Sequence, residues 1–296
     1  VEHPVTECIT GLDLVEQMIR IAAGEKLAFT QKDLKRNGWA IECRINAEDP
    51  FRNFLPSTGR LVKYRPPAQN MEASQPVPDG GGVRVDTGVY EGGEIPMFYD
   101  SMIAKLIVHG RDRNEAIARM REALNGFVIR GISSNIPFQA ALLAHPRFVK
   151  GDFNTGFIAE QYPKGFSIEA VPHDQPAFLL ALAAISHRRI RERATTLGGQ
   201  RRAHEVRIRE DFVVVLTDGE GRRDQIPVGV REVGKLYHVS VAGQTHEVGL
   251  DVSLREIAVH GTFDGKPFCA QIERVGLGYR IHFFFQAEDG IRDNER

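Results

Sequence analysis

The sequence has few cysteines, little net charge and no long apolar run, and each of these scarcities excludes a class of protein. Its 296 residues contain only Cys8, Cys43 and Cys269, too few and too scattered for a disulfide framework or a zinc site. The 38 basic and 39 acidic residues leave a formal net charge of −1. Proteins that bind nucleic acid or membrane surfaces normally carry a basic excess, so we expect neither partner. No apolar run approaches the roughly 20 residues of a membrane helix.

The remaining composition is that of an ordinary globular protein. Hydrophobic residues make up 42% of the chain and charged residues 26%, which excludes a disordered chain. At about 150 residues per domain, the length predicts roughly two domains. The scarcity of cysteine favours a reducing compartment, which we expect to be the cytoplasm, or the mitochondrial matrix if the source is a eukaryote.

The first half of the chain mixes helix and strand patterns, which predicts an α+β domain. Residues 39–46, WAIECRIN, alternate as a strand with an apolar face and a second face that carries Glu42 and Arg44. Asp112 and Glu115 have the spacing of a capping box at the start of a helix. We therefore expect the apolar face of the strand to pack on a core and its charged face to meet water, a partner or a site.

The second half has a different texture. Residues 163–173 contain two prolines and a glycine and are typical of a linker. The following helical pattern ends in a run of arginines, which suits the negative end of a helix dipole. From residue 204 onward, short strand patterns alternate with Asp-Gly turns. About eight such strands predict a small antiparallel barrel or sandwich.

Three segments carry groups that could do chemistry, and each has an ordinary structural interpretation when it is taken alone. Residues 2–7, EHPVTE, place two carboxylates around a proline, which is typical of a surface turn. Arg44 lies on the polar face of its strand, where a structural ion pair and a fixed cation that holds an anion are both open. Asp100, between Tyr99 and Ser101, is typical of a capped turn.

Taken together and in order, the segments are much more specific. EHPVTE, ECRINAEDP, FLPSTG, GVRVDTGVY, FYDSMIAKLI and the NIPF start of a helix form a series that resembles the C-terminal half of the biotin carboxylase family. This resemblance covers residues 1–162. Residues 174–285 resemble the linking domain of propionyl-CoA carboxylase α subunits, in which a long helix precedes an eight-stranded antiparallel barrel.

The resemblance implies a domain order and a set of site residues. It assigns residues 1–30 to the end of an ATP-grasp domain, 31–162 to the biotin carboxylase C-terminal domain, 163–173 to a linker and 174–285 to the linking domain. Glu2 would be the general base that deprotonates bicarbonate, and the backbone N–H of Val1 would line the bicarbonate pocket. Arg44 would hold bicarbonate and the ureido oxygen of biotin. Asp100 would lie near this site and Arg84 at a homodimer interface, and no metal ligand is expected in this segment.

The resemblance also implies cofactors and partners. The intact enzyme, a ligase, would use ATP, Mg²⁺ (or Mn²⁺) and biotin, with bicarbonate as a substrate. The chain begins at Val1 inside the first motif, and the family's ATP-gripping residues, metal-binding carboxylates and biotin-carrier domain have no counterpart in it. We therefore expect a fragment that holds none of these cofactors and is inactive alone. The barrel would dock on the carboxyltransferase β subunit, and the carrier domain would belong to the same α subunit.

Two alternatives to a propionyl-CoA enzyme and one feature of the C-terminus stay open. The α subunit of another acyl-CoA carboxylase, for 3-methylcrotonyl-CoA or acetyl-CoA, would have the same series of motifs. A non-catalytic binding module built on the barrel is a more distant alternative, motivated by the arginines near the end of the helix. Residues 286–293, QAEDGIRD, resemble the translation of a common sequencing adaptor, so we expect residues 286–296 to be non-native.

Overall fold

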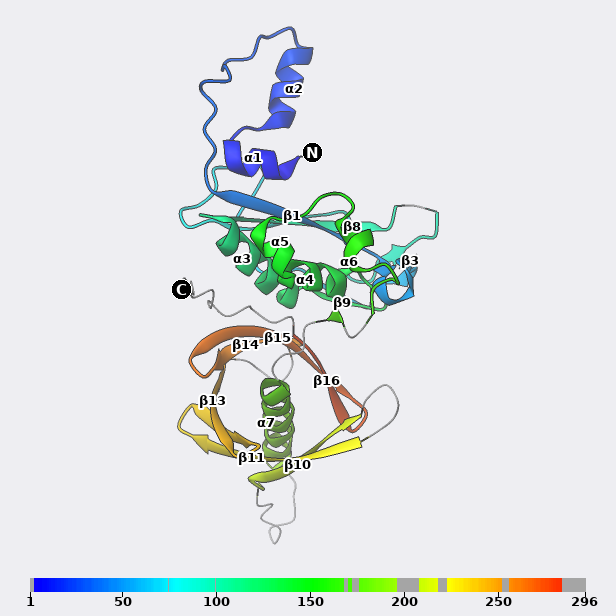
Figure 1. Ribbon diagram of the computed structural model, residues 1–296, viewed down its shortest axis with the longest axis vertical. Coiled ribbons are helices and arrows are strands. Elements are labelled where there is room, and N and C mark those ends of the chain that lie inside the picture. Colours follow the sequence, from blue (N-terminus) through cyan, green and yellow to red (C-terminus); the bar gives the residue numbers. More distant parts are fainter. Residues whose placement is uncertain are drawn as a thin grey trace. The chain divides into compact units, whose positions relative to one another are not determined.

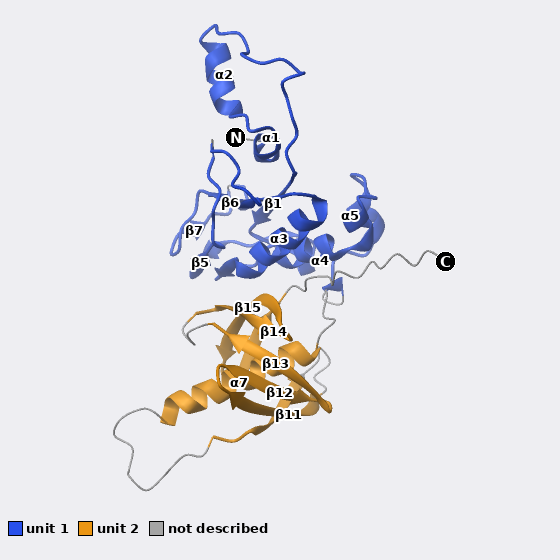
Figure 2. Cartoon of the chain, turned by 90° about the vertical axis from the view of Figure 1, so that its left-hand side faces the viewer, with its two compact units in different colours: residues 1–172, 284–296 blue, residues 173–283 orange. Residues whose placement is uncertain are grey.

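The computed structural model describes residues 3–73, 75–98, 100–167, 170–171, 176–195, 208–217, 223–251 and 256–283. The chain divides into two compact units, coloured blue and orange in Figure 2. Unit 1 comprises residues 1–172 and 284–296, and unit 2 comprises residues 173–283. Each unit has a hydrophobic core of its own, as a domain that folds as a unit requires. The residues interpreted as a non-native tail, 286–296, lie outside the described part of the chain.

Unit 1 mixes helices with short strands, as the sequence predicts. Its helices are α1 (Pro4–Thr10), α2 (Leu14–Ala22), the 3₁₀ helix η1 (Pro50–Arg52), α3 (Arg113–Gly126), α4 (Ile136–Ala144), α5 (Pro146–Lys150) and α6 (Phe157–Gln161). Its strands are β1 (Trp39–Asn46), β2 (Glu48–Asp49), β3 (Leu55–Pro56), β4 (Gly59–Arg60), β5 (Lys63–Arg65), β6 (Gly82–Thr87), β7 (Glu94–Ile95), β8 (Met102–Gly110) and β9 (Val128–Arg130).

A three-stranded antiparallel sheet, in the order β1–β8–β6, is the frame of unit 1 (Figure 1). Cys43 and Ile45 of β1 share one hydrophobic core with Leu106 and Val108 of β8 and with Met120 of α3. Because side chains alternate along a strand, the residues between them point to the opposite face of the sheet. The alternation predicted for this strand is therefore confirmed, and helix α3 covers its apolar face.

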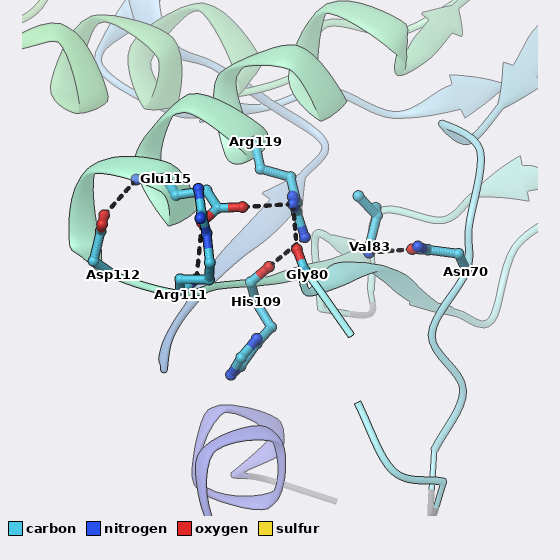
Figure 3. A network of polar contacts seen from close by, with 8 residues as sticks. All are labelled: Asn70, Gly80, Val83, His109, Arg111, Asp112, Glu115 and Arg119. Atoms are coloured by element: carbon cyan, nitrogen blue, oxygen red, sulfur yellow. Dashed lines mark hydrogen bonds and ion pairs between the residues drawn. The ribbon is translucent and has the colours of Figure 1, made fainter. Parts of the chain in front are cut away.

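A polar network fastens the start of α3 to the sheet (Figure 3). Asp112 Oδ1 accepts the backbone N–H of Glu115 at 2.9 Å, so the predicted N-cap is confirmed. The Glu115 carboxylate accepts the N–H of Arg111 at 3.0 Å, one residue before the N-cap, which differs from the return bond of a regular capping box. Arg119 of α3 donates to the carbonyl oxygen of His109 in β8 at 2.7 Å. Helix α3 is thereby tied to the central strand.

Unit 2 is a helix enclosed by a curled antiparallel sheet (Figure 1). Helix α7 (Pro176–Thr195) is followed by seven strands that pair in sequence order. They are β10 (Asp211–Thr217), β11 (Arg223–Val233), β12 (Leu236–Val241), β13 (Gln244–Leu250), β14 (Ala258–Phe263), β15 (Lys266–Val275) and β16 (Gly278–His282). The predicted helix with a small antiparallel β structure is confirmed. The described strands number seven where about eight were expected, and residues 204–207 of the first expected strand lie outside the described part.

The core of unit 2 forms between α7 and the concave face of its sheet. Phe178 and Ile185 of α7 are buried with Val239 of β12 and Val248 of β13. The ring of Phe178 meets that of Phe268 edge to face, with centroids 4.8 Å apart. A sheet of this length curls because its strands twist, and the helix fills the space that the curl encloses. Among the helices of the described residues, none is long and apolar enough to cross a membrane.

Candidate active site

One face of the β1–β8–β6 sheet carries charge on all three strands. The register places Arg44 of β1 opposite Lys105 of β8, and Lys105 opposite Asp86 of β6. Glu42 and Arg84 lie in the next row of the same face, on the two outer strands. Directly opposite like charges destabilise a sheet, so the Arg44 and Lys105 positions together favour anions nearby. The face opposite α3 is therefore the charged side of this domain, where Arg44, Lys105 and Arg84 lie among the carboxylates of Glu42 and Asp86.

Arg44, the residue predicted to hold an anion, lies at the exposed end of this face. Its side chain is 56% exposed, and its Nε donates to Glu42 at 3.2 Å. Exposed ion pairs of this kind contribute only about 0–1 kcal/mol to stability. The structural ion pair, one of the two interpretations of Arg44 from the sequence, is present. Enough of the guanidinium is exposed to contact a ligand as well. The geometry thus allows Arg44 to bind an anion while it keeps its ion pair with Glu42.

Helix α1 lies on the same face of the sheet. Cys8 of α1 packs with Ala40 of β1 and Ile107 of β8. Because side chains alternate along a strand, these two residues point away from the face that packs on α3. The helix begins at Pro4, which suits the first turn, and ends at Gly11 in the left-handed conformation. The EHPVTE segment, which alone is typical of a surface turn, is therefore mostly the start of a helix. Sequence reasoning did not predict this helix.

Val1 and Glu2, the predicted bicarbonate-pocket residue and general base, lie outside the described residues. The described chain begins at His3, immediately before α1. The structure thus places α1, the helix that follows Val1 and Glu2 in the sequence, on the sheet face that carries Arg44. Their roles stay predictions.

Arg84 joins β6 to α1 through a buried ion pair that sequence reasoning missed. Its guanidinium donates to both carboxylate oxygens of Asp86, at 2.7 and 2.6 Å, and lies 3.7 Å from Glu7 Oε2. The Arg84 and Glu7 side chains are 7% and 9% exposed. Burial disfavours the charged guanidinium, but the hydrogen bonds and charge of Asp86 outweigh it and raise the pKa of Arg84. The predicted homodimer role of Arg84 stays a prediction, and within this chain Arg84 fixes α1 to the sheet.

Asp100 lies in the turn that leads into β8. Its Oδ1 accepts the N–H of Met102 at 3.0 Å, which is the capped turn expected from the sequence. The hydroxyl of the next residue, Ser101, donates a hydrogen bond to the Glu48 carboxylate at 2.5 Å. The backbone carbonyl oxygen of Ser101 accepts the N–H of Ala47 at 2.7 Å. These bonds dock the turn against the chain that leaves β1. Asp100 is therefore close in the fold to the end of the strand that carries Arg44, and its role near the site stays a prediction.

A pocket of about 270 Å³ opens between α1, the start of α2 and the chain before β6. Its charged lining residues are the acidic Glu7, Asp13, Glu16 and Glu72 and the buried Arg84. Asp13 and Glu7 already accept backbone N–H groups of α2, at 2.9 and 3.0 Å. In the described part of the chain, no group of three or more histidine, cysteine or acidic residues could hold a metal ion.

Cys43 lies between these charged residues in the sequence but on the opposite face of the strand, where it is 4% exposed. Burial, with a smaller contribution from the charge of Glu42, raises the pKa of its thiol to about 12. The reactive thiolate is therefore scarce below pH 10 and forms only as the pH nears 12. We expect iodoacetamide at pH 8 to leave Cys43 unmodified in the folded chain and to alkylate it after denaturation, as peptide mass mapping would measure. Alkylation of folded Cys43 at the rate of a free thiol would contradict this environment.

Three known families match the chain in consecutive segments. Residues 1–30 match the ATP-binding domain of the carbamoyl-phosphate synthase L chain. Residues 42–160 match the biotin carboxylase C-terminal domain, which includes the strand with Arg44 and the start of α4. Residues 179–284 match the propionyl-coenzyme A carboxylase BT domain, which corresponds to α7 and the curled sheet.

Two propionyl-CoA carboxylase alpha chains are among the similar proteins. The propionyl-CoA carboxylase alpha chain of Ruegeria pomeroyi is 44% identical over 290 residues, which are 95% of this chain and 42% of the relative. The mitochondrial propionyl-CoA carboxylase alpha chain of Homo sapiens is 49% identical over 185 residues, 62% of this chain and 24% of the relative. The chain thus spans less than half the length of these curated relatives.

Solved structures resemble unit 1. A biotin carboxylase domain of a thermophilic 2-oxoglutarate carboxylase, bound to bicarbonate, is 41% identical and superposes with a TM-score of 0.50. The match covers 58% of this chain and 35% of that chain.

Proposed function

Because the chain belongs to the biotin carboxylase family, with a biotin carboxylase C-terminal domain followed by a propionyl-CoA carboxylase BT domain, we propose that it is part of the α chain of a propionyl-CoA carboxylase. The observation that carries this proposal is the order of the two domains in one chain, which its Ruegeria relative shares over 95% of the sequence. The reaction would be the ATP- and bicarbonate-dependent carboxylation of biotin, whose carboxyl group then passes to propionyl-CoA.

In the proposed reaction, the carboxylate of Glu2 would accept the proton that bicarbonate loses as its oxygen attacks the γ-phosphate of ATP, which would form carboxyphosphate and release ADP. Biotin, when bound, would supply the N1′ nitrogen that takes up the carboxyl group, and Arg44 would hold its ureido oxygen, where negative charge would develop. The exposed guanidinium of Arg44 and the packing of α1 on its sheet face support this pairing. The backbone N–H of Val1 would complete the bicarbonate pocket.

ATP, Mg²⁺ (or Mn²⁺) and biotin are the cofactors that the proposed enzyme would need. The guanidinium of Arg44 suits bicarbonate and the ureido group, and the described residues hold no group of three or more histidine, cysteine or acidic residues that could bind a metal ion. We therefore propose that ATP and its metal are held by parts of the α chain outside this sequence. The chain alone is then expected to cleave no ATP in the presence of bicarbonate, as phosphate release would measure.

The BT domain suggests the partners. We propose that unit 2 docks the α chain on a carboxyltransferase β subunit, and that a biotin-carrier domain of the same α chain brings biotin to the site. We also propose a reducing compartment, the cytoplasm or, in a eukaryote, the mitochondrial matrix. The three cysteines are free, and similar α chains carry the name mitochondrial.

The proposal is tested with the full-length α chain and its β subunit. The α chain alone should incorporate radiolabelled bicarbonate into biotin only when ATP and Mg²⁺ are present. With the β subunit, propionyl-CoA should accept the label faster than acetyl-CoA or 3-methylcrotonyl-CoA. An α chain that labels no biotin under these conditions would contradict the proposed reaction, whereas a preference for another acyl-CoA would correct the substrate alone.

Helix α2 gives a further prediction, because its apolar residues lack the burial that an amphipathic helix needs. Met18 and Ile19 are 68% and 64% exposed, and no described residue of α2 is buried. We propose that the remainder of an ATP-binding domain covers this face, since residues 1–30 match such a domain. Replacing both residues with Gln should reduce concentration-dependent association of this chain in sedimentation experiments.

The same double substitution should have the opposite effect in the full-length α chain. There it should lower the free energy of unfolding by more than about 3 kcal/mol, because two large side chains would lose their burial. Glu25→Gln, just after α2, is the matched control and should change neither association nor unfolding. Equal stability of the full-length chain with and without the double substitution would show that the face is exposed there too.

A further inference from the structure

Strand β1 is an outer strand of its sheet, so one of its two edges has no neighbouring strand among the described residues. An unpaired edge leaves backbone N–H and C=O groups without ladder partners, and these groups must be satisfied in another way. The edge that faces away from β8 includes the carbonyl of Arg44 and both backbone groups of Asn46. The register of β1 with β8 also shifts between Ile45 and Asn46, so the ladder is least regular beside Arg44.

Asn135, the residue before α4, takes the place of a neighbouring strand at this edge. Its Nδ2 donates to the carbonyl oxygen of Arg44 at 3.0 Å, and its Oδ1 accepts the N–H of Asn46 at 3.0 Å. Its own backbone N–H donates to the carbonyl oxygen of Asn46 at 3.1 Å. The side-chain orientation is unambiguous, because a backbone N–H can only donate and a carbonyl oxygen can only accept. Asn135 is 6% exposed, so these bonds are shielded from water.

Gln139, one turn further along α4, also holds the backbone of Arg44. Its Nε2 donates to the carbonyl oxygen of Arg44 at 3.2 Å, so that this oxygen accepts two side-chain amides from one helix. The side chain of Arg44 is held much more weakly, since it is more than half exposed and contacts Glu42 in a surface ion pair. The direction in which Arg44 leaves the strand is therefore set mainly by how its backbone is held.

We propose that Asn135 and Gln139 are positioning residues for Arg44, through which α4 fixes the guanidinium in the site. This inference rests on the proposed function and deepens it, because it concerns the same anion and ureido group. A fixed cation stabilises developing charge only if it is already in place, and displacement by about 1 Å can cost a hundredfold in rate. Both residues act through the backbone of Arg44 and touch no substrate.

The test uses the full-length α chain and compares substitutions that remove single bonds. Asn135→Asp keeps the acceptor for the N–H of Asn46 but removes the donor to Arg44, and Gln139→Ala removes the second donor. We expect Asn135→Asp to lower kcat/KM for biotin about tenfold to a hundredfold and Gln139→Ala to lower it severalfold. Gln139→Asn, which keeps an amide on a shorter side chain, should recover part of the loss.

The decisive readout is a double-mutant cycle with Arg44→Met. If Asn135 acts only through Arg44, Asn135→Asp should cause no further loss in the Arg44→Met background. Leu142→Ala, on the same helix but packed away from β1, is the control for a general loss of stability and should leave kcat/KM unchanged. It tests whether weakening α4 alone would affect the reaction.

Two outcomes would overturn the inference while the proposed function stands. One is wild-type kcat/KM in Asn135→Asp. The other is the same fold-loss from Asn135→Asp with and without Arg44, which would indicate a role independent of the guanidinium. A wild-type α chain that carboxylates no biotin would instead contradict the proposed function, and this inference with it.

Discussion

Replacing Arg44 with Met in the full-length α chain is expected to slow biotin carboxylation about a hundredfold to a thousandfold. In the proposed mechanism, the substitution removes a fixed cation from the point where negative charge would develop on the ureido oxygen. The fold should be unaffected, because the Arg44 side chain is 56% exposed and its ion pair with Glu42 is of the weak surface kind. Radiolabel transfer from bicarbonate to biotin, together with thermal unfolding, would measure both quantities.

Arg111→Met is the matched control for Arg44→Met. Arg111 is also an exposed arginine in an ion pair, with Glu115 at 2.7 Å, but it belongs to the turn before α3. The Arg111→Met variant should carboxylate biotin at the wild-type rate. Comparable rates for wild type and Arg44→Met would show that Arg44 takes no part in the reaction. The proposed mechanism would then have no group that stabilises the oxyanion.

Replacing Arg84 with Met is expected to produce the largest change in stability. The substitution leaves the buried carboxylate of Glu7 without its cation beneath α1, and breaking a buried ion pair costs about 3–5 kcal/mol. It also removes the two hydrogen bonds that Arg84 donates to the more exposed Asp86. For a unit of this size, that loss should lower the unfolding midpoint of unit 1 by roughly 6–20 °C. Calorimetry or circular dichroism at neutral pH would measure it.

A second substitution distinguishes an unpaired charge from a general packing defect. Arg84→Met combined with Glu7→Gln removes a stranded carboxylate, so the double variant should recover part of the lost stability. Gln also keeps an acceptor for the N–H of Leu14, which Glu7 accepts at 3.0 Å. If Arg84→Met unfolds at the wild-type temperature, the ion pair does not hold α1 to the sheet.

The strand with Arg44 could be predicted from the sequence because its alternation is a local property. Residues 39–46 read as a strand with one apolar face, and Cys43 and Ile45 are indeed buried against the core under α3. The cap at Asp112 and the buried stripe of α7, with Phe178 and Ile185, were predictable for the same reason. Spacing within one element is sufficient for such inferences.

The contacts that hold the site together could not be predicted, because they join residues far apart in the sequence. Glu7 and Arg84 meet only when α1 lies on the sheet, and neither residue has a local pattern that signals burial. Asn135 reaches Arg44 across 91 positions of the chain. Helix α1 was missed because seven residues are too few for a clear helical period. The resemblance to a family gave predicted roles for residues such as Arg44, whereas the fold shows which contacts hold Arg44 in place.

A crystal structure of the full-length α chain with bicarbonate and biotin would test the central claim most directly. We expect the carboxylate of Glu2 and the guanidinium of Arg44 to lie within about 2.6–3.2 Å of the same bicarbonate, with Arg44 also contacting the ureido oxygen of biotin. A structure with both ligands bound at a site from which Arg44 is absent would contradict the proposed mechanism.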